Sequence, residues 1–321
     1  MMSTKIVFLD KGSIPAHIPF KKVGQQHQWH EYDKTSPKDI VERCIDADII
    51  ITNKVVLTAE IIAKLTTLKH IAVIATGFNN VDVEYCKTHN ISVSNTPGYS
   101  VTSVPEHTFA LIFSLRRHLF TYHNNVMNGG WTQSPHFHGY SSQTFDLKDA
   151  QLGIIGGGSL GQATAAMGRA LGLKVVFADR KHQKPSNKST YLSFDELISS
   201  SDIISLHCPL TSETENLITL AEFQKMKSNA LLINTARGGL VNEQDLVTAL
   251  NQKLIAGAGF DVASSEPIAK DNPLLSLSDN TNFILTPHVG WSSDSSLQCQ
   301  SDIVVENIEC FLEGKPLNLV T

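Results

Sequence analysis

The sequence predicts an α/β protein of two domains, each built on a doubly wound parallel sheet. Its 321 residues are long for a single hydrophobic core, which favours two domains. Short apolar runs of strand type alternate with segments of helical character along most of the chain, as expected for parallel strands with helices on both faces. Near the middle, Gly156, Gly158 and Gly161 follow an apolar run at the spacing G-x-G-x-x-G.

The first hundred residues form one α/β pattern. Strands are expected at residues 6–9, 49–51, 71–74 and 91–93, with helices at 38–45 and 59–65. The turn-forming sequence Asn-Thr-Pro-Gly at 95–98 ends the pattern. We therefore expect residues 1–100 to belong to a domain of their own.

A long connecting helix is predicted from about residue 100, because apolar residues recur at three- and four-residue steps from Val104 to Val126. Asn128-Gly129-Gly130 should end it. The following segment, 131–145, carries Trp131 and Phe137 among Ser, Pro and Gln residues and predicts an extended loop. Two readings of this loop stay open: an arm, near 120–145, that packs on a partner subunit, or a loop buried in its own chain.

After the glycines, the alternation supplies six strand candidates, which match a complete doubly wound sheet. The strands are expected at 152–155, 175–178, 203–206, 230–234, 255–260 and 283–285, and the helices at 194–199, 220–226 and 243–250. A last helix, 296–312, should return to the first domain. The expected division is therefore 1–100 with 291–321 as one domain and 101–290 as the other, with a cleft between them.

Composition narrows the class of protein. The net charge of −5 and the lack of any long Lys/Arg cluster argue against nucleic acid as a partner. No apolar stretch reaches membrane-spanning length, and no signal peptide is recognised at the start. Five scattered cysteines without a C-x-x-C pair fit reduced thiols in the cytoplasm, and the thirteen histidines have no metal-site spacing. We expect a cytoplasmic protein without a metal.

The glycine segment predicts a dinucleotide cofactor. Gly156 would permit the tight turn, Gly158 would let a pyrophosphate approach the backbone, and Gly161 would let the helix lie on the sheet. The N–H groups at the helix start, including those of Ser159 and Leu160, would face the phosphates.

The choice of cofactor rests on the end of the second strand. Asp179 lies 18 residues after Gly161 (179 − 161), where a carboxylate can bond a ribose 2′-hydroxyl and repel a 2′-phosphate. NAD is therefore favoured over NADP, although Arg180 beside it could meet a phosphate.

Three later strand ends carry complementary reactive groups. Arg237 could hold a substrate carboxylate through a two-pronged, charge-assisted bond. His288 could supply or accept a proton, and an acid such as Asp261 or Glu266 could orient it. Singly, these residues could be a surface ion pair, a turn residue before Pro267 or a loop histidine. Together they form an apparatus for carbonyl reduction.

These motifs resemble the D-isomer-specific 2-hydroxyacid dehydrogenases, whose fold pairs a Rossmann nucleotide-binding domain with a flavodoxin-like substrate domain. The resemblance is carried by Gly153-Ile-Ile-Gly-Gly-Gly-Ser-Leu-Gly161, Leu206-His-Cys-Pro-Leu210, Asn234-Thr-Ala-Arg-Gly-Gly-Leu-Val241, Gly259-Phe-Asp-Val262, Thr286-Pro-His288 and Ala75-Thr-Gly-Phe-Asn-Asn-Val-Asp82.

The resemblance implies roles for individual residues. Arg237 would bind substrate, Glu266 and His288 would form the acid/base pair, and the loop at Thr76, Gly77 and Phe78 would hold the substrate carboxylate. The remaining cofactor contacts would come from His207, Cys208, Pro209, Thr235, Ala236, Asp261 and Gly290. The family also implies a homodimer.

Within the family, the chain is most similar to glycerate dehydrogenase, also called hydroxypyruvate reductase. That similarity lies in the 75–82 loop, in Ser103-Val-Pro-Glu-His-Thr-Phe-Ala-Leu111 and in the Trp131 segment. It implies hydroxypyruvate and glyoxylate as substrates, yielding D-glycerate and glycolate. The alternatives are another D-2-hydroxy acid, such as D-lactate, or a nicotinamide-sensing corepressor-like protein. Two departures stand out: Gly157 replaces a larger residue, and Val289-Gly290 replaces a commoner pair.

Overall fold

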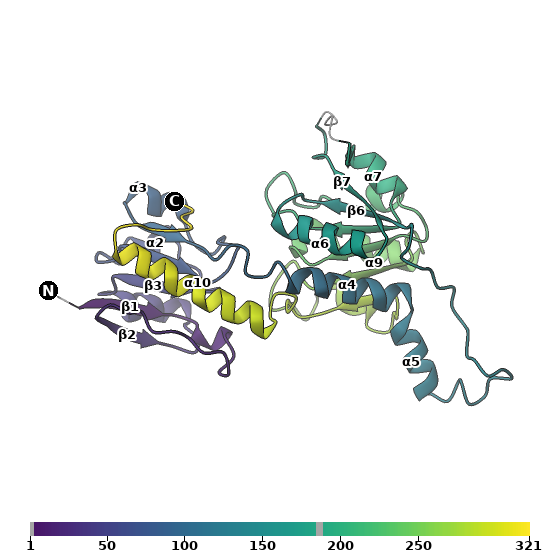
Figure 1. The fold of residues 1–321 in the computed structure, drawn as a ribbon, viewed down its shortest axis with the longest axis horizontal. Helices are drawn as coiled ribbons and strands as arrows, with labels where there is room; N and C mark the ends of the chain where they lie inside the picture. The colour runs from purple at the N-terminus through teal and green to yellow at the C-terminus, as the bar shows by residue number, and fades with distance from the viewer. Residues whose placement is uncertain (1–2, 184–188) are drawn as a thin grey trace. The chain divides into compact units, whose positions relative to one another are not determined.

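The computed structural model describes residues 3–183 and 189–321, and the chain divides into two compact units (Figure 1). Unit 1 comprises the residues up to Tyr99 together with Ser292–Thr321, and unit 2 comprises Ser100–Trp291. Each boundary lies one residue from the boundary expected from the sequence. Within the described residues, no helix has the length and apolar character needed to cross a membrane.

Unit 1 contains a five-stranded parallel sheet of order β2-β1-β3-β4-β5. Its strands are β1 (Thr4–Phe8), β2 (His27–Glu31), β3 (Ile49–Thr52), β4 (His70–Val73) and β5 (Ser92–Ser94). The central strands β3 and β4 are buried throughout, as their apolar sequences predict. The edge strand β2 was not predicted, because its sequence His-Gln-Trp-His-Glu has no apolar run.

The helices of unit 1 are short except for the last one. They are η1 (Lys11–Ser13), η2 (Pro37–Asp39), α1 (Ile40–Cys44), α2 (Ala59–Ile62), α3 (Val83–Thr88) and α10 (Asp294–Leu312). Helix α10 packs beside β4, where the buried amide of Gln300 donates to the carbonyl of Ile74 at 2.7 Å and that of Asn307 donates to the carbonyl of Asn95 at 2.8 Å. The C-terminal helix thus completes the first unit and supports its strand ends.

Unit 2 contains a seven-stranded parallel sheet of order β12-β11-β10-β9-β6-β7-β8. Its strands are β6 (Gln151–Ile155), β7 (Lys174–Ala178), β8 (Tyr191–Leu192), β9 (Ile203–Leu206), β10 (Leu231–Asn234), β11 (Gly257–Phe260) and β12 (Phe283–Leu285). The six predicted strands are present, and the two-residue edge strand β8 is additional. The strand order reverses beside β6, where β7 lies on one side and β9 on the other, and ligands of such sheets bind at that point.

The helices of unit 2 cover both faces of this sheet. They are α4 (Ser103–Arg116), α5 (Leu119–Met127), α6 (Ser159–Ala170), α7 (Phe194–Ser200), α8 (Leu220–Phe223), η3 (Gly238–Leu240), α9 (Glu243–Asn251) and η4 (Pro273–Leu277). Helices α4 and α6 form one apolar layer with the sheet, which includes Phe109 and Ile112 of α4 and Ala165 of α6. The opposite layer contains α7, α8 and α9.

The expectation of one continuous helix from residue 100 to 127 was wrong. His118 adopts a left-handed backbone with φ of 51°, so α4 ends and α5 starts in a new direction. The apolar spacing continues across this break, which is why the sequence pattern did not reveal it. The buried residues of α4 lie in the core, whereas α5 has no buried residue.

Candidate active site

The glycine turn between β6 and α6 has the shape required for a dinucleotide. Gly156 has φ of 109°, and a Cβ there would lie 2.5 Å from the carbonyl carbon of His207. A Cβ at Gly161 would lie 1.9 Å from the Gly156 oxygen, whereas one at Gly158 would meet nothing within 4 Å. The turn is therefore closed toward the protein and open at Gly158. Because Gly158 has no side chain to cap α6, the first N–H groups of the helix are available to a phosphate.

The unusual Gly157 is explained by its neighbour Tyr191. A Cβ at position 157 would lie 2.5 Å from the Tyr191 hydroxyl oxygen, and the Tyr191 ring stacks on Phe177 with centroids 5.3 Å apart. The tyrosine thus fills the space that a larger residue at position 157 would need.

Asp179 and Arg180 follow β7, the strand that pairs with β6 beside the glycine turn. The Asp179 N–H donates to the Leu192 carbonyl at 2.8 Å, which fixes the residue at the strand end. Asp179 is half-buried and Arg180 is exposed. The carboxylate therefore lies at the edge where the sequence placed it.

His207, Cys208 and Pro209 follow β9, on the other side of the glycine turn. The His207 Nε2 lies 2.9 Å from the Ser205 hydroxyl, and burial lowers the pKa of His207 to about 4, so its ring is neutral at pH 7. Burial raises the pKa of Cys208 to about 11, so its thiol is protonated and unreactive. Both side chains therefore present uncharged surface at this edge.

The segment after β10 is shaped by the buried amide of Asn234. Its oxygen accepts the Ala236 N–H at 3.1 Å and its nitrogen donates to the Arg237 carbonyl at 2.8 Å. Thr235 meets Thr108 of α4 at 3.0 Å between hydroxyl oxygens, and the Nη1 of Arg237 donates to the Ala236 carbonyl at 2.6 Å. Both ends of the Thr235–Arg237 segment are thus held in place.

Glu266 and His288 lie together, as the sequence predicted. The His288 Nδ1 is 2.6 Å from one carboxylate oxygen of Glu266, and the other oxygen accepts the Ala263 N–H at 3.2 Å. The side chains are 23% exposed for His288 and 38% exposed for Glu266, so the pair is reachable from solvent. The loop that carries Glu266 is anchored by buried Glu243, whose oxygens accept the N–H and hydroxyl of Ser264 at 2.6 and 2.7 Å.

Asp261, at the end of β11, is 1% exposed, and protein donors occupy both of its oxygens. One oxygen accepts the Thr286 hydroxyl at 2.5 Å and the Val289 N–H at 2.9 Å, and the other accepts the Gly290 N–H at 2.7 Å. Burial by itself would raise the pKa of Asp261, but hydrogen bonds from His107, Thr286 and the two backbone groups outweigh it and lower that pKa. Asp261 is therefore a buried carboxylate that holds the 286–290 turn.

Three residues that hold this edge in place were not predicted from the sequence as site residues. Trp291 donates its indole N–H to the His288 carbonyl at 2.8 Å, His107 contacts Thr286, and Glu243 anchors the Glu266 loop. None of the three directly follows a strand, where the ligand-binding residues of a parallel sheet are expected. His107 lay inside a motif noted for its family resemblance, which was the available signal.

In unit 1, the predicted substrate loop follows β4. The Thr76 hydroxyl donates to the Thr96 carbonyl at 3.1 Å, and the Asn95 amide donates to the Thr76 carbonyl at 2.8 Å. Thr76 and Phe78 are exposed and Gly77 is half-buried, so the backbone of the loop is accessible.

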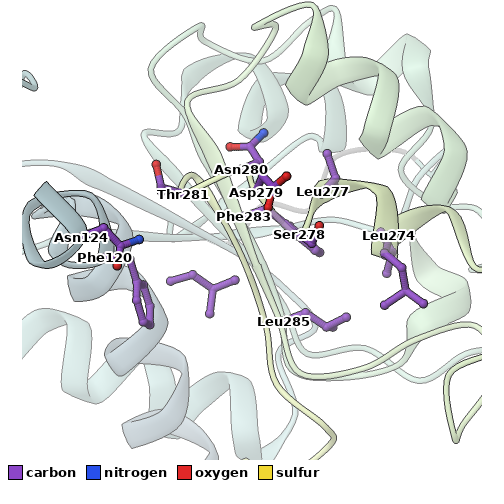
Figure 2. Close-up of a pocket in the computed structure, with 12 residues that line it drawn as sticks. Phe120, Asn124, Leu274, Leu277, Ser278, Asp279, Asn280, Thr281, Phe283 and Leu285 are labelled. Carbon is purple, nitrogen blue, oxygen red and sulfur yellow. The ribbon is translucent and has the colours of Figure 1, made fainter. Parts of the chain in front are cut away.

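Unit 2 also contains a cavity of about 570 Å³, shown in Figure 2, and none of the site residues named above lines it. It is lined by Phe120 and Asn124 of α5 and by the segment from Leu274 to Leu285. Within the described residues, no three His, Cys, Asp or Glu side chains are grouped to hold a metal ion.

Comparison with known proteins shows the family of the chain. Residues 109–290 match the family model described as D-isomer specific 2-hydroxyacid dehydrogenase, NAD binding domain. A glycerate dehydrogenase of Methylorubrum extorquens is 42% identical over 320 residues, covering 99% of this chain and 99% of that protein. A hydroxypyruvate reductase of Blautia hydrogenotrophica is 39% identical over 322 residues, covering 98% and 99%.

Solved structures are similar over the full length. An acyclic imino acid reductase in complex with NADPH and D-Arg has a TM-score of 0.87 at 32% identity and covers 99% of this chain and 100% of its own. A D-lactate dehydrogenase from Aquifex aeolicus, complexed with NAD and lactic acid, has a TM-score of 0.84 at 30% identity and covers 98% of each chain.

A dinucleotide-binding turn in a sheet that also carries a histidine–carboxylate pair is typical of nicotinamide-dependent dehydrogenases, in which a side chain moves the proton that accompanies a hydride. The family match spans more than half of the chain. The chain belongs to the D-isomer-specific 2-hydroxyacid dehydrogenases, and it is an NAD-dependent oxidoreductase.

Proposed function

We propose that this enzyme reduces hydroxypyruvate to D-glycerate and glyoxylate to glycolate with NADH. The observation that carries the proposal is the His288–Glu266 pair, with 2.6 Å between Nδ1 and the carboxylate, on the loops that follow two adjacent strands. The substrate choice is supported by the relatives named glycerate dehydrogenase, hydroxypyruvate reductase and glyoxylate reductase.

His288 gives its proton to the carbonyl oxygen of the 2-oxo acid during reduction and takes it back during oxidation. Because Glu266 bonds Nδ1, the proton that moves is on Nε2, the other ring nitrogen. Bound NADH supplies the hydride. A neutral alcohol forms from a carbonyl only when hydride and proton are both delivered, so the histidine and the cofactor act on the same bond.

Arg237 binds the carboxylate of the substrate in this proposal. Its Nη1 is used by the Ala236 carbonyl, which fixes the guanidinium and leaves the Nε and Nη2 edge to hold two oxygens. In unit 1, the backbone of Thr76, Gly77 and Phe78 supplies N–H donors for a substrate carboxylate. A substrate with a carboxylate next to the carbonyl is thereby held with its reactive carbon in a fixed position.

The cofactor is bound at the end of β6 and at the ends of the strands on either side of it. Gly156, Gly158, Ser159, Leu160 and Gly161 hold the pyrophosphate. Asp179 and Arg180 lie at the adenosine ribose, and the nicotinamide side is lined by His207, Cys208, Pro209, Thr235, Ala236, Asp261 and Gly290. The buried, fully bonded carboxylate of Asp261 supports a mainly indirect role for that residue, through the turn that it holds.

The proposal also includes a cytoplasmic homodimer that forms through α5 and the segment 131–145. Burial of this segment in its own chain, the alternative reading, is not observed, since Phe137 is 91% exposed. Exposed apolar side chains are concentrated there: Leu119, Phe120, Val126, Met127, Trp131, Phe137 and Tyr140. Light scattering should report a dimer for the parent and a monomer for Met127→Asp/Phe137→Asp. Leu317→Asp, which changes an exposed leucine in unit 1, should stay dimeric.

The test of the activity is NADH consumption with hydroxypyruvate, glyoxylate, pyruvate and a bulky branched 2-oxo acid. The proposal expects the highest kcat/KM with hydroxypyruvate and the next with glyoxylate, and it expects His288→Asn to lose most turnover. Preference for pyruvate would point to a D-lactate enzyme. Binding of NADH without turnover of any oxo acid would point to a nicotinamide sensor instead.

A further inference from the structure

The backbone of His288 is held in an unusual conformation. Its φ of 56° lies in the left-handed region, which residues with a Cβ rarely adopt unless their surroundings impose it. The conformation sets where the imidazole points, because the side chain leaves the backbone at Cα. The contacts that hold this turn therefore fix the orientation of the His288 imidazole.

The turn is held at His288 itself and at the two residues that follow it. Asp261 accepts the N–H groups of Val289 and Gly290 at 2.9 and 2.7 Å. The Trp291 indole donates to the His288 carbonyl at 2.8 Å. A Cβ at Gly290 would lie 2.9 Å from an Asp261 oxygen, so the two segments are in close contact.

His107 of α4 reaches the same turn from the helix layer. Its Nε2 lies 2.9 Å from the Thr286 hydroxyl oxygen and 3.4 Å from an Asp261 oxygen. The Thr286 hydroxyl has one proton, and the ionised carboxylate 2.5 Å away can only accept it. The same hydroxyl oxygen is then an acceptor toward His107, so we assign the proton of His107 to Nε2. The result is a directed hydrogen-bond relay from His107 to Thr286 to Asp261.

The His107 end of this relay is rigid. His107 lies between Glu106 and Thr108 in the first half of α4, and the buried residues Thr108 and Phe109 fix that part of the helix against the sheet. Helix α4 packs against β10, β11 and β12, the strands that end at the reactive groups. A donor placed on such a helix can restrain a turn more firmly than one placed on another loop.

We propose that His107 and Thr286 are positioning residues for His288, which act by fixing Asp261 and, through it, the left-handed 288–290 turn. The inference rests on the proposed role of His288 as the proton carrier. This positioning role differs from a direct contact with the cofactor, because the relay ends on the backbone N–H groups of Val289 and Gly290.

The kinetic test uses three substitutions. Thr286→Val keeps the shape but removes the hydroxyl, His107→Leu removes the donor, and His107→Gln keeps a donor near Nε2. We expect the first two to lower kcat for hydroxypyruvate by about 10- to 100-fold, the range for misplacing a catalytic group by up to ~1 Å. KM and the Kd for NADH should change by less than about threefold, and His107→Gln should recover most of kcat.

A double substitution tests whether His107 and Thr286 act through one relay. His107→Leu/Thr286→Val should be no slower than the slower single variant, because either change already breaks the relay. Thr248→Val is the matched control, since its hydroxyl bonds only within α9 among the described residues, and it should behave like the parent. Losses that multiply, or an unchanged kcat in both single variants, would overturn the proposal. So would a higher Kd for NADH with unchanged kcat.

Amide hydrogen exchange supplies a readout that needs no substrate. In His107→Leu, a peptide covering residues 286–291 should exchange faster than in the parent, while peptides of unit 1 should be unchanged. Unchanged exchange at 286–291 would overturn the relay even if activity fell. If exchange changed as expected but His288→Asn kept full turnover, the relay would stand and the role of His288 would fail.

Discussion

Replacement of Arg237 by alanine is the sharpest test of how substrate is anchored. The residue stands after β10 on a segment held by both atoms of the Asn234 amide, and its Nη1 donates to the Ala236 carbonyl at 2.6 Å. One end of the guanidinium is therefore fixed on its own loop. The Nε and Nη2 edge makes no hydrogen bond to the residues that the structure describes, so it is free to hold a carboxylate.

The magnitude follows from the bonds that would be lost. A hydrogen bond to a charged group is worth about 1.5–3 kcal/mol, and two parallel bonds to one carboxylate share part of that energy. Because Arg237 is only half-buried, we take about 2–4 kcal/mol for the pair after discounting for solvent. At ~1.4 kcal/mol per factor of ten, this predicts a loss of roughly 30- to 1,000-fold in kcat/KM.

The assay compares kcat/KM for hydroxypyruvate among Arg237→Ala, Arg237→Lys and the parent. Arg237→Lys should recover only part, because an ammonium group cannot present two parallel donors. Guanidinium added to the alanine variant should restore activity in a saturable way. Arg169→Ala, which removes an exposed arginine from the last turn of α6, is the control and should match the parent. If Arg237→Ala were as active as that control, the substrate anchor would lie elsewhere.

Three further outcomes are expected. Asp179→Ala should narrow the preference for NADH over NADPH in kcat/KM, and equal efficiency of the two cofactors in the parent would contradict the role of this carboxylate. Glu266→Gln removes a charge 2.6 Å from the His288 Nδ1, so the rate of reduction should decline at a lower pH than in the parent, and oxidation should continue to a lower pH than in the parent. Unchanged pH–rate profiles would leave Glu266 as a turn residue. Burial lowers the pKa of His70 to about 4, while an unfolded histidine titrates near ~6.5, so the stability that the neutral ring contributes is lost as pH falls from ~6.5 to about 4. In His70→Gln, the free energy of unfolding should fall less steeply over that window, by up to ~1.4 kcal/mol per pH unit, and an unchanged slope would refute the assignment.

Among the described strands, the sequence predicted all except β2 and β8, each of which lies at one edge of its sheet. Central parallel strands such as β3 and β10 are buried on both faces and read as continuous apolar runs. Strand β2 is largely exposed, so its residues need not be apolar, and β8 is only two residues long. The break at His118 was equally invisible, because a single left-handed residue leaves the spacing of apolar side chains intact.

The site was predictable where a residue follows a strand. That rule found Arg237 and His288, and the pairing of His288 with Glu266 was expected because a proton carrier needs an orienting partner. It could not find His107, since the distance between a helix residue and a turn nearly 180 positions later depends on the packing of α4 on the sheet. Nor could it predict that both carboxylate oxygens of Asp261 accept hydrogen bonds from the protein.

The buried polar residues at the strand ends explain why this edge can hold reactive groups on loops. Asn234 and Asp261 are 0% and 1% exposed, and a polar group at such depth is costly unless it is fully hydrogen-bonded. Each is bonded to the backbone of the segment that follows its own or the next strand, so any movement of that segment would leave a buried amide or carboxylate without its partners. The loops carrying Arg237 and His288 are therefore restrained by the cost of breaking buried hydrogen bonds, and the reactive side chains themselves can stay partly exposed to meet a substrate.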